Sequence, residues 1–330
     1  MIKVLFENSI FLHQKVGGVS KYIFELNETF LKNNVSAKIL APITINDYLV
    51  KKKNIIYFFK IKKIPKFCRK FFFLLNNLLT FTYIQLKKPD ILHFSYYNKS
   101  LIKFLNIPYV VTVYDLIHEK MNFDQKEFEK KFLLEKAKHI ICISEETKKD
   151  LIKIYKINQK KITVIYLGVR NIKFQKVKKK FKYILYVGSR SRYKNFNNLV
   201  KAFSKSKYLI KNYKIICFGG GDFNNYEKKN FEKLKIKDCI KHKSGNDNQL
   251  SNFYKKASLH VSLSTHEGFG LTLLEAMKLK CPVVCSDILV FREIYKKSCE
   301  YVNSQNIYSI KKGIENVLKS SKKQKKLILN

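Results

Sequence analysis

The chain has 330 residues, 46% of them hydrophobic, and its 66 basic and 25 acidic residues give a formal net charge of +41. This length exceeds what one small core needs and predicts two domains, while the hydrophobic content excludes a disordered chain. The charge would suit a polyanion, but only five of the basic residues are arginine, and specific nucleic-acid readers depend on arginine for bidentate contacts. We therefore expect no specific nucleic acid as partner.

Short apolar segments alternate with helical stretches along the whole chain. The expected strands are residues 2–6, 35–40, 91–94, 109–113 and 139–143 in the first half, and residues 183–187, 214–218, 259–263 and 283–285 in the second. This βαβ alternation is typical of parallel sheets, and it predicts an α/β fold with a doubly wound, Rossmann-like sheet in each half.

A lysine-rich polar stretch, residues 171–182, interrupts the alternation and is the expected linker. It separates an N-terminal domain, residues 1–170, from a second domain, residues 183–306, and a last helical stretch covers residues 307–330. The first expected strand begins at once, without the layout of a signal peptide, so we expect a cytoplasmic location.

The candidate site residues of the first half follow expected strands. Gly17 and Gly18 follow the first strand and open a helix, and their spacing is not the G-x-G-x-x-G of a dinucleotide site. Asp115 and His118 follow the fourth strand, and a carboxylate or an imidazole can accept a proton, although a lone histidine is more often structural. Ser144, after the fifth strand, predicts a helix N-cap.

Residues 57–86 mix lysine with dense aromatic side chains. The charge-free run from Phe71 has sixteen residues and contains Asn76 and Asn77, so it is too short and too polar to span a bilayer. Two interpretations carry equal weight. The segment is either a basic, aromatic helix that lies in the interface of an anionic membrane, or a core helix with a solvated lysine-rich flank.

Two loops of the second half also follow expected strands. Arg190 and Lys194 lie in a basic loop after the strand 183–187, and a solvated basic loop is the alternative to a binding role. Gly219 and Gly220 end the next strand, where they either admit the close approach of a nucleotide or only form a turn.

The segment from Thr265 to Met277 is the most informative part of the chain. Glu267 and Glu275 stand eight residues apart, across a turn in which Gly268 and Gly270 flank Phe269 and after which Leu271 opens a helix. The free N–H groups at the start of that helix make a site for a diphosphate. Glu275, about one turn into the helix, is then placed for ribose hydroxyls, and Glu267 in the loop is placed near a reacting sugar.

This segment resembles the E-x7-E signature of the retaining glycosyltransferases of family 4, also called group 1. Residues 282–287 and 291–294 are similar to the strand and helix that follow it in the family. Departures are Thr272 and Leu289, where proline is usual, and Lys280, where glycine is usual. The resemblance implies the GT-B fold, in which two doubly wound parallel-sheet domains face each other across a cleft.

The resemblance also implies roles for individual residues. Arg190 and Lys194 match the pair that clamps the donor diphosphate, and Gly17 and Gly18 match a glycine pair near the donor phosphate and acceptor. Ser244 falls in a region near the nucleotide base. Tyr114 stands where histidine is usual, which leaves Asp115 and His118 as candidates to orient the acceptor hydroxyl. Residues 307–330 are expected to pack back on the N-terminal domain, as in the family.

The activity so implied is retaining transfer of a hexose, mannose-like, from a nucleotide-diphosphate sugar to a sugar hydroxyl. The expected acceptor is a lipid-linked precursor of a surface polysaccharide or lipopolysaccharide, at the inner face of the membrane. The sequence has no D-x-D motif and no C-x-x-C pair, so we expect neither a metal ion nor another cofactor. The alternatives are a non-catalytic protein that binds polyanions or membrane surfaces, and an epimerase of the GT-B fold.

Overall fold

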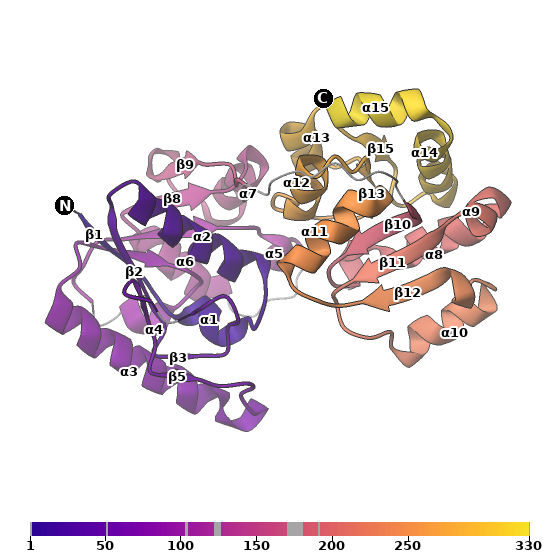
Figure 1. Cartoon of the computed structure of the whole chain (residues 1–330). Helices are drawn as coiled ribbons and strands as arrows, with labels where there is room; N and C mark the ends of the chain where they lie inside the picture. The colour runs from indigo at the N-terminus through magenta and orange to yellow at the C-terminus, as the bar shows by residue number, and fades with distance from the viewer. Residues whose placement is uncertain are drawn as a thin grey trace. The chain divides into compact units, whose positions relative to one another are not determined.

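The computed structural model describes residues 2–50, 52–102, 105–121, 127–169, 181–190 and 192–329. The chain divides into two compact units, Met1–Tyr166 (unit 1) and Leu167–Asn330 (unit 2). Each unit is an α/β structure built around its own parallel sheet, as the strands and helices in Figure 1 show. The predicted fold class is therefore confirmed for both halves of the chain.

Unit 1 contains a seven-stranded parallel sheet in the order β4-β2-β1-β6-β7-β8-β9. Its strands are β1 (Lys3–Phe6), β2 (Ser36–Leu40), β4 (Ile55–Ile56), β6 (Ile91–Phe94), β7 (Tyr109–Val113), β8 (His139–Cys142) and β9 (Ile162–Val164), and a short pair joins β3 (Ile43–Thr44) to β5 (Phe59–Lys60). The α-helices are α1 (Ser9–His13), α2 (Gly18–Lys32), α3 (Arg69–Lys87), α4 (Lys99–Ile102), α5 (Ile117–Lys120), α6 (Glu127–Lys136) and α7 (Glu145–Tyr155).

Unit 2 contains a six-stranded parallel sheet in the order β12-β11-β10-β13-β14-β15. Its strands are β10 (Phe181–Val187), β11 (Lys214–Phe218), β12 (Ile240–Lys243), β13 (Ala257–Ser262), β14 (Val283–Ser286) and β15 (Glu300–Val302). Its α-helices are α8 (Phe196–Ser204), α9 (Lys207–Asn212), α10 (Asn225–Lys233), α11 (Asp247–Lys256), α12 (Leu271–Lys278), α13 (Leu289–Tyr295), α14 (Ile307–Lys319) and α15 (Ser321–Leu329).

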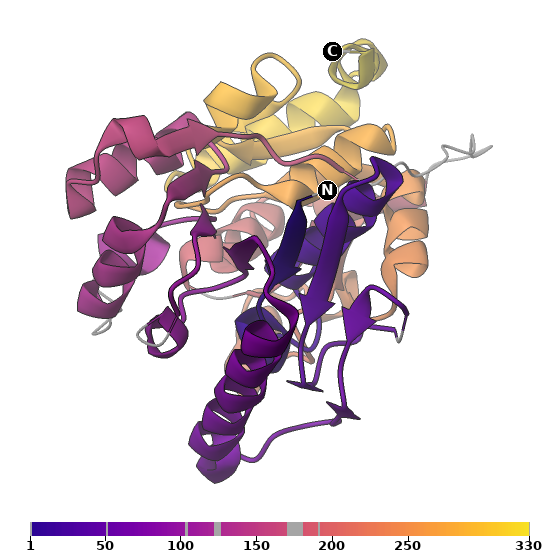
Figure 2. The ribbon, with the colours of Figure 1, turned by 90° about the vertical axis from the view of Figure 1, so that its left-hand side faces the viewer.

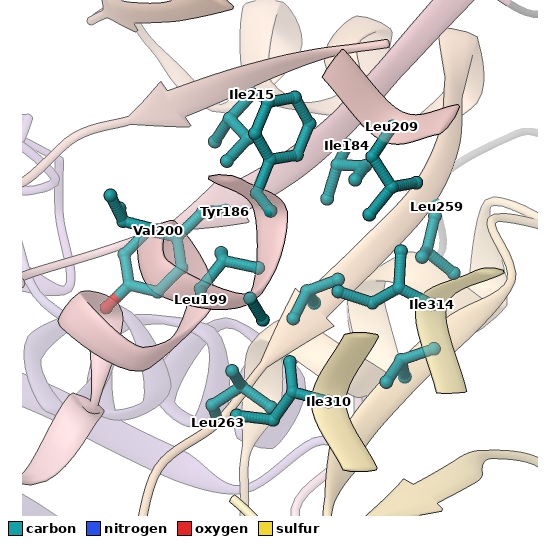
Figure 3. Packing of buried hydrophobic residues seen from close by; sticks show 14 of the residues in the cluster. Ile184, Tyr186, Leu199, Val200, Leu209, Ile215, Leu259, Leu263, Ile310 and Ile314 are labelled. Carbon is teal, nitrogen blue, oxygen red and sulfur yellow. The ribbon is translucent and has the colours of Figure 1, made fainter. Parts of the chain in front are cut away.

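The strands of unit 2 are apolar on both faces because helices cover both faces of the sheet. Successive residues of β10 show this, since Ile184 joins one core cluster and Leu185 joins another, and both are fully buried. Figure 3 shows the first cluster, in which side chains of β10, α8 and α14 interlock. The loops at the carboxyl edge of the sheet are thereby fixed to a rigid scaffold.

The C-terminal helices complete that core. α14 packs against α8 and β15, where Ile310, Ile314 and Val317 are fully buried, and Leu327 of α15 joins the same cluster. α14 and Leu327 of α15 thus contribute to the core of unit 2, and the predicted packing of this segment on the N-terminal domain stays a prediction. Of the expected linker, residues 171–180 lie outside the described residues, whereas Phe181 and Lys182 already belong to β10.

Within the described ranges, none of the helices combines the length and the apolar character needed to cross a membrane.

Candidate functional site

The strand order of unit 2 defines a point at which ligands can bind. The chain runs outward from β10 through β11 to β12 and then returns to β13 on the other side of β10. In open parallel sheets ligands bind at such a switch point, outside the carboxyl ends of the two central strands. Here the loop after β10 meets the loop after β13, and Thr265 N donates a hydrogen bond to Tyr193 O at 2.8 Å.

An ion pair links the same two loops. Lys194 Nζ lies 2.5 Å from Glu267 Oε1, and the two side chains are 25% and 15% exposed. The ammonium group also lies 5.0 Å from the centre of the Tyr193 ring. The structure thus brings together two residues 73 positions apart, both of which the sequence analysis singled out, and leaves both partly accessible to a ligand.

The turn before α12 is held in one conformation. Gly270 has a φ of +92°, a region that residues with a side chain rarely adopt, and a Cβ atom there would lie 2.6 Å from Phe291 Cε1. The Tyr295 hydroxyl donates to the carbonyl oxygens of Phe269 at 3.1 Å and Gly270 at 2.7 Å. Gly268 and Phe269 are buried, so this turn belongs to the core.

The N-terminus of α12 follows directly from this turn. Leu271 is the first residue of the helix, Gly270 is its N-cap, and no side chain caps it. Its first turn also contains no acidic residue. The N–H groups of that turn, together with the positive end of the helix dipole, therefore form a suitable site for an anion. This helix begins four residues after Glu267.

Glu275 lies one turn into α12 and is half-buried. The hydroxyl of Tyr254, a side chain that is 1% exposed, donates to Glu275 Oε2 at 3.3 Å. Burial, and then the neighbouring Glu275 carboxylate, raise the pKa of Tyr254 well above its usual range, so the hydroxyl keeps its proton. Tyr254, which the sequence analysis missed, orients the second glutamate of the signature.

Arg190 has a different environment from the one that the sequence analysis implied. Its Nε donates to Glu227 Oε1 at 2.6 Å, and its Nη2 donates to the carbonyl oxygens of Gly221 at 3.0 Å and Asp222 at 2.9 Å. The guanidinium carbon lies 4.8 Å from the centre of the Phe223 ring, and the side chain is 5% exposed. These contacts hold the Arg190 guanidinium against the loop after β11, its role at a diphosphate stays a prediction, and Lys194 is a second cation, at the switch point.

The glycines after β11 are required by that loop. Gly219, Gly220 and Gly221 have φ values of +78°, +73° and +77°. A Cβ atom on Gly220 would overlap the carbonyl oxygen of Gly188, so the loops after β10 and β11 approach at backbone level. Ser244, in contrast, is exposed in the connection between β12 and α11. Gly219, Gly220 and Ser244, the residues predicted to lie near the base, thus belong to neighbouring loops at one edge of the sheet.

Unit 1 has its own switch point, between β1 and β6, and a buried carboxylate occupies it. Glu7 is fully buried, and its Oε1 accepts from the N–H and hydroxyl of Ser95 at 2.8 and 2.6 Å. Its Oε2 accepts from the N–H and hydroxyl of Ser9 at 2.8 and 2.7 Å. Burial is the largest effect on this group and raises the pKa of Glu7. The only sequence signal for this residue is its place directly after the first strand.

The predicted residues of unit 1 lie in two segments, one at the start of α2 and one after β7. Gly17 is the N-cap of α2, and a Cβ atom there would overlap the side-chain amide of Gln14, while Gly18 is the first residue of the helix. Asp115 is half-buried, and its Oδ1 accepts from Ile117 N at 3.2 Å. His118 is exposed on α5.

The comparisons with known proteins agree with this architecture. Residues 168–330 match the family model of group 1 glycosyl transferases, and residues 16–171 match that of glycosyltransferase family 4. The two models together cover the chain from residue 16 to its end. The chain belongs to the group 1 glycosyltransferases of family 4.

Individual relatives point the same way. The O-antigen chain mannosyltransferase RfbU of Salmonella typhimurium is 32% identical over 216 residues, which are 63% of this chain and 60% of that protein. The match therefore spans less than two thirds of the relative.

Solved structures share the fold. Anabaena Alr3699/HepE in complex with UDP-glucose superposes with a TM-score of 0.79 at 14% identity, covering 100% of this chain and 93% of that one. WaaG, a glycosyltransferase involved in lipopolysaccharide biosynthesis, gives 0.77 at 14% identity, covering 99% and 94%.

Proposed function

We propose that this protein is a retaining glycosyltransferase that moves a hexose from a nucleotide-diphosphate sugar to a sugar hydroxyl, without a metal ion. The observation that carries the proposal is the Lys194–Glu267 pair at the switch point of unit 2, next to the uncapped N-terminus of α12. A cation, a helix N-terminus and a carboxylate are the groups that transfer from a diphosphate donor requires.

Charge development explains the division of labour. As the glycosidic bond to the donor breaks, negative charge grows on the leaving diphosphate, and groups fixed near it stabilise the transition state. We assign this role to Lys194 and to the N–H groups of the turn from Gly268 to Leu271. Glu267 holds the ammonium in place and lies near the sugar, where positive charge develops.

The nucleoside end of the donor is assigned to neighbouring loops. Glu275, oriented by Tyr254, accepts hydrogen bonds from the ribose hydroxyls. Gly219 and Gly220, in the turn that Arg190 organises, and Ser244 border the base. Arg190 shapes this turn through its bonds to Glu227 and the loop carbonyls, and with Lys194 it stays a proposed cation for the diphosphate.

The acceptor is proposed to be a lipid-linked glycan. RfbU is named as an O-antigen chain mannosyltransferase and WaaG as an enzyme of lipopolysaccharide biosynthesis. By analogy we expect a mannose-like donor sugar and an acceptor carried at the cytoplasmic face of a membrane. Asp115 is the candidate to orient the acceptor hydroxyl, with His118 as the second candidate. Gly17 and Gly18 have no side chain, so the backbone there can approach the donor phosphate and the acceptor closely.

The first test measures nucleotide binding. GDP, UDP, dTDP and ADP, each with and without its sugar, are titrated into the wild type, Glu275→Ala and Lys194→Met, and the melting temperature is followed. A ligand that binds the folded state raises it. We expect one base to give a shift that both variants reduce, while Lys228→Met, an exposed lysine on α10, keeps it. No shift with any nucleotide would contradict the proposal.

The second test separates binding from chemistry. Glu267→Gln removes the charge near the sugar but keeps the shape of the side chain, so we expect kcat to fall at least about a hundredfold while the nucleotide shift persists. The assay follows free nucleoside diphosphate together with the glycosylated acceptor. Conversion of the donor sugar without acceptor product would favour an epimerase instead.

A further inference from the structure

The helix α3 of unit 1 buries polar side chains and exposes apolar ones. Its buried face carries Asn76, Asn77 and Thr80. Asn76 Oδ1 accepts from the backbone N–H of Ile43 at 2.7 Å, and the hydroxyl of Thr80 accepts from Asn8 at 2.7 Å. Specific hydrogen bonds therefore attach the helix to the unit, in addition to the apolar packing of Ile84, Phe72 and Phe73.

The opposite face of this segment is apolar and exposed. Phe67, Phe71, Leu74 and Leu78 are 88%, 63%, 64% and 61% exposed. From Phe71 to Leu78 the spacing is three and then four residues, which places these side chains on one face of α3, and Phe67 immediately precedes the helix. α3 lies along the margin of unit 1 in both views of the ribbon (Figure 2). A contiguous apolar surface of this kind marks a binding face.

A basic cavity opens beside the N-terminal end of the same helix. It has a volume of about 470 Å³ and an apolar part formed by Leu12, Ile45 and Ile64. The remaining lining is basic or imidazole, namely His13, Lys15, Lys62, Lys63 and Arg69. Among the described residues, no aspartate or glutamate lines it. The nearest carboxylate to Lys15 is outside the lining, with Asp47 Oδ2 at 4.0 Å from Lys15 Nζ.

The cavity has the chemistry of a phosphate site. Arg69 begins α3 and offers a planar fork, whereas Lys62 and Lys63 are point charges, and all three are exposed enough to reach a ligand. Leu12 and Ile64 belong to a small apolar cluster against which Phe72 and Phe73 of α3 pack. The same core therefore fixes both the basic cavity and the helix with the apolar face.

We propose that this cavity binds the phosphate headgroup of an anionic membrane phospholipid, while Phe67, Phe71, Leu74 and Leu78 enter the acyl layer beside it. Phospholipid is the occupant that fits both features, because a free phosphate would leave the apolar face exposed. A bilayer with anionic headgroups offers charge and apolar surface at neighbouring depths. This site would hold the protein at the membrane that carries the proposed lipid-linked acceptor. Its test does not depend on glycosyl transfer.

The experiment compares vesicle binding of the full chain and two charge-reversal pairs. Co-sedimentation is measured with vesicles of phosphatidylcholine alone and with roughly one third phosphatidylglycerol. We expect binding only to the anionic vesicles. Lys62→Glu with Lys63→Glu should weaken it at least about tenfold, and Lys228→Glu with Lys229→Glu, the same charge change on α10, should weaken it less than about threefold.

A second pair of variants tests the apolar face. Phe71→Ser with Leu74→Ser should also lower binding about tenfold, whereas Leu289→Ser with Tyr308→Ser, exposed apolar residues of unit 2, should leave it unchanged. Because all the altered side chains are exposed, circular dichroism should show that each variant folds.

Three outcomes would overturn the proposal. Equal losses in both charge pairs would assign binding to diffuse net charge. Equal binding to phosphatidylcholine alone would exclude the headgroup. Binding of inorganic phosphate to the cavity, measured by titration and lost in the Lys62/Lys63 variant, without any vesicle binding would make it a site for a soluble anion.

Discussion

A glutamate lies at the switch point of each unit, and the two have different environments. Glu7, after β1, is fully buried and accepts hydrogen bonds from both serines at the unit 1 switch point. Glu267, after β13, is partly exposed and paired with Lys194. A buried carboxylate whose two oxygens both accept hydrogen bonds from the protein stabilises the fold. A partly exposed carboxylate that is paired with a cation can still reach a substrate. Glu267 is for this reason the candidate for chemistry.

Buried histidines give the protein a defined response to acid. His260 in β13 is fully buried, its Nδ1 lies 3.1 Å from Leu185 O, and burial lowers its pKa to about 4. The folded-state pKa lies below the unfolded value near 6.5, so the unfolded state takes up a proton first. Neutral His260 makes its full contribution to the free energy of unfolding above pH ~6.5, and this contribution is lost as the pH falls toward ~4.

We expect unit 2 of the wild type to lose up to about 3 kcal/mol of unfolding free energy from this group over that range. His260→Asn, which keeps a hydrogen-bond donor but cannot titrate there, should remove most of this pH dependence. Urea unfolding at pH ~7.5 and ~4 measures both proteins. An unchanged pH dependence in the variant would show that other groups cause the acid response. His93 of unit 1, whose pKa burial also lowers to about 4, acts with the same sign.

At the scale of elements, the loops after β10, β11 and β13 carry the donor site, and three devices hold them. These are the Lys194–Glu267 pair, the Arg190 bonds to the glycine turn, and the Tyr295 bonds to the turn before α12. Each one joins a loop to another element, so the loops have little freedom to rearrange. Such rigidity suits a site that stabilises charge, because fixed dipoles need not reorganise during the reaction.

Gly270→Ala tests this rigidity. The variant must accept a φ of +92° and a methyl group against Phe291, so we expect a loss of about 1–3 kcal/mol of unfolding free energy and weaker nucleotide binding. Gly168→Ala is the control, because a Cβ atom there meets nothing within 4 Å. Urea unfolding and nucleotide titration report the two effects. Wild-type nucleotide affinity in Gly270→Ala would show that the turn geometry is not needed for the donor.

At the scale of the whole molecule, the net charge of +41 is the dominant electrostatic fact. Like charges on a compact chain repel one another, and salt screens that repulsion within a Debye length of about 10 Å at 0.1 M. The same charge favours anionic surfaces, which is consistent with the basic cavity beside α3.

We expect the melting temperature to rise by a few degrees between about 20 mM and about 300 mM sodium chloride. Lys228→Glu with Lys229→Glu lowers the net charge by four, since each change replaces +1 by −1, and should make the rise smaller. Differential scanning calorimetry measures both. A melting temperature that falls with salt would mean that favourable ion pairs, such as Lys194–Glu267, outweigh the repulsion.

The sequence by itself determined the features that depend on local pattern. Apolar runs bounded by turns located the long strands, and Ser144 is the N-cap that its position predicted, accepting from Thr147 N at 3.1 Å. The spacing of Glu267 and Glu275 around a glycine turn identified the family, because the motif is contiguous. Two-residue strands such as β3 and β5 escaped, since a strand that short has no periodicity.

Only the tertiary structure decided which polar groups meet. Glu7 and Ser95 are 88 residues apart, and the pairing of Arg190 with Glu227 joins the loop after β10 to helix α10. The sequence left residues 57–86 between two interpretations, and the structure shows that α3 turns Asn76 and Asn77 inward and Phe71, Leu74 and Leu78 outward. The physical reason is the same in each case. Local periodicity reports which residues share a face, but the partners of a buried polar group are set by the fold that surrounds it.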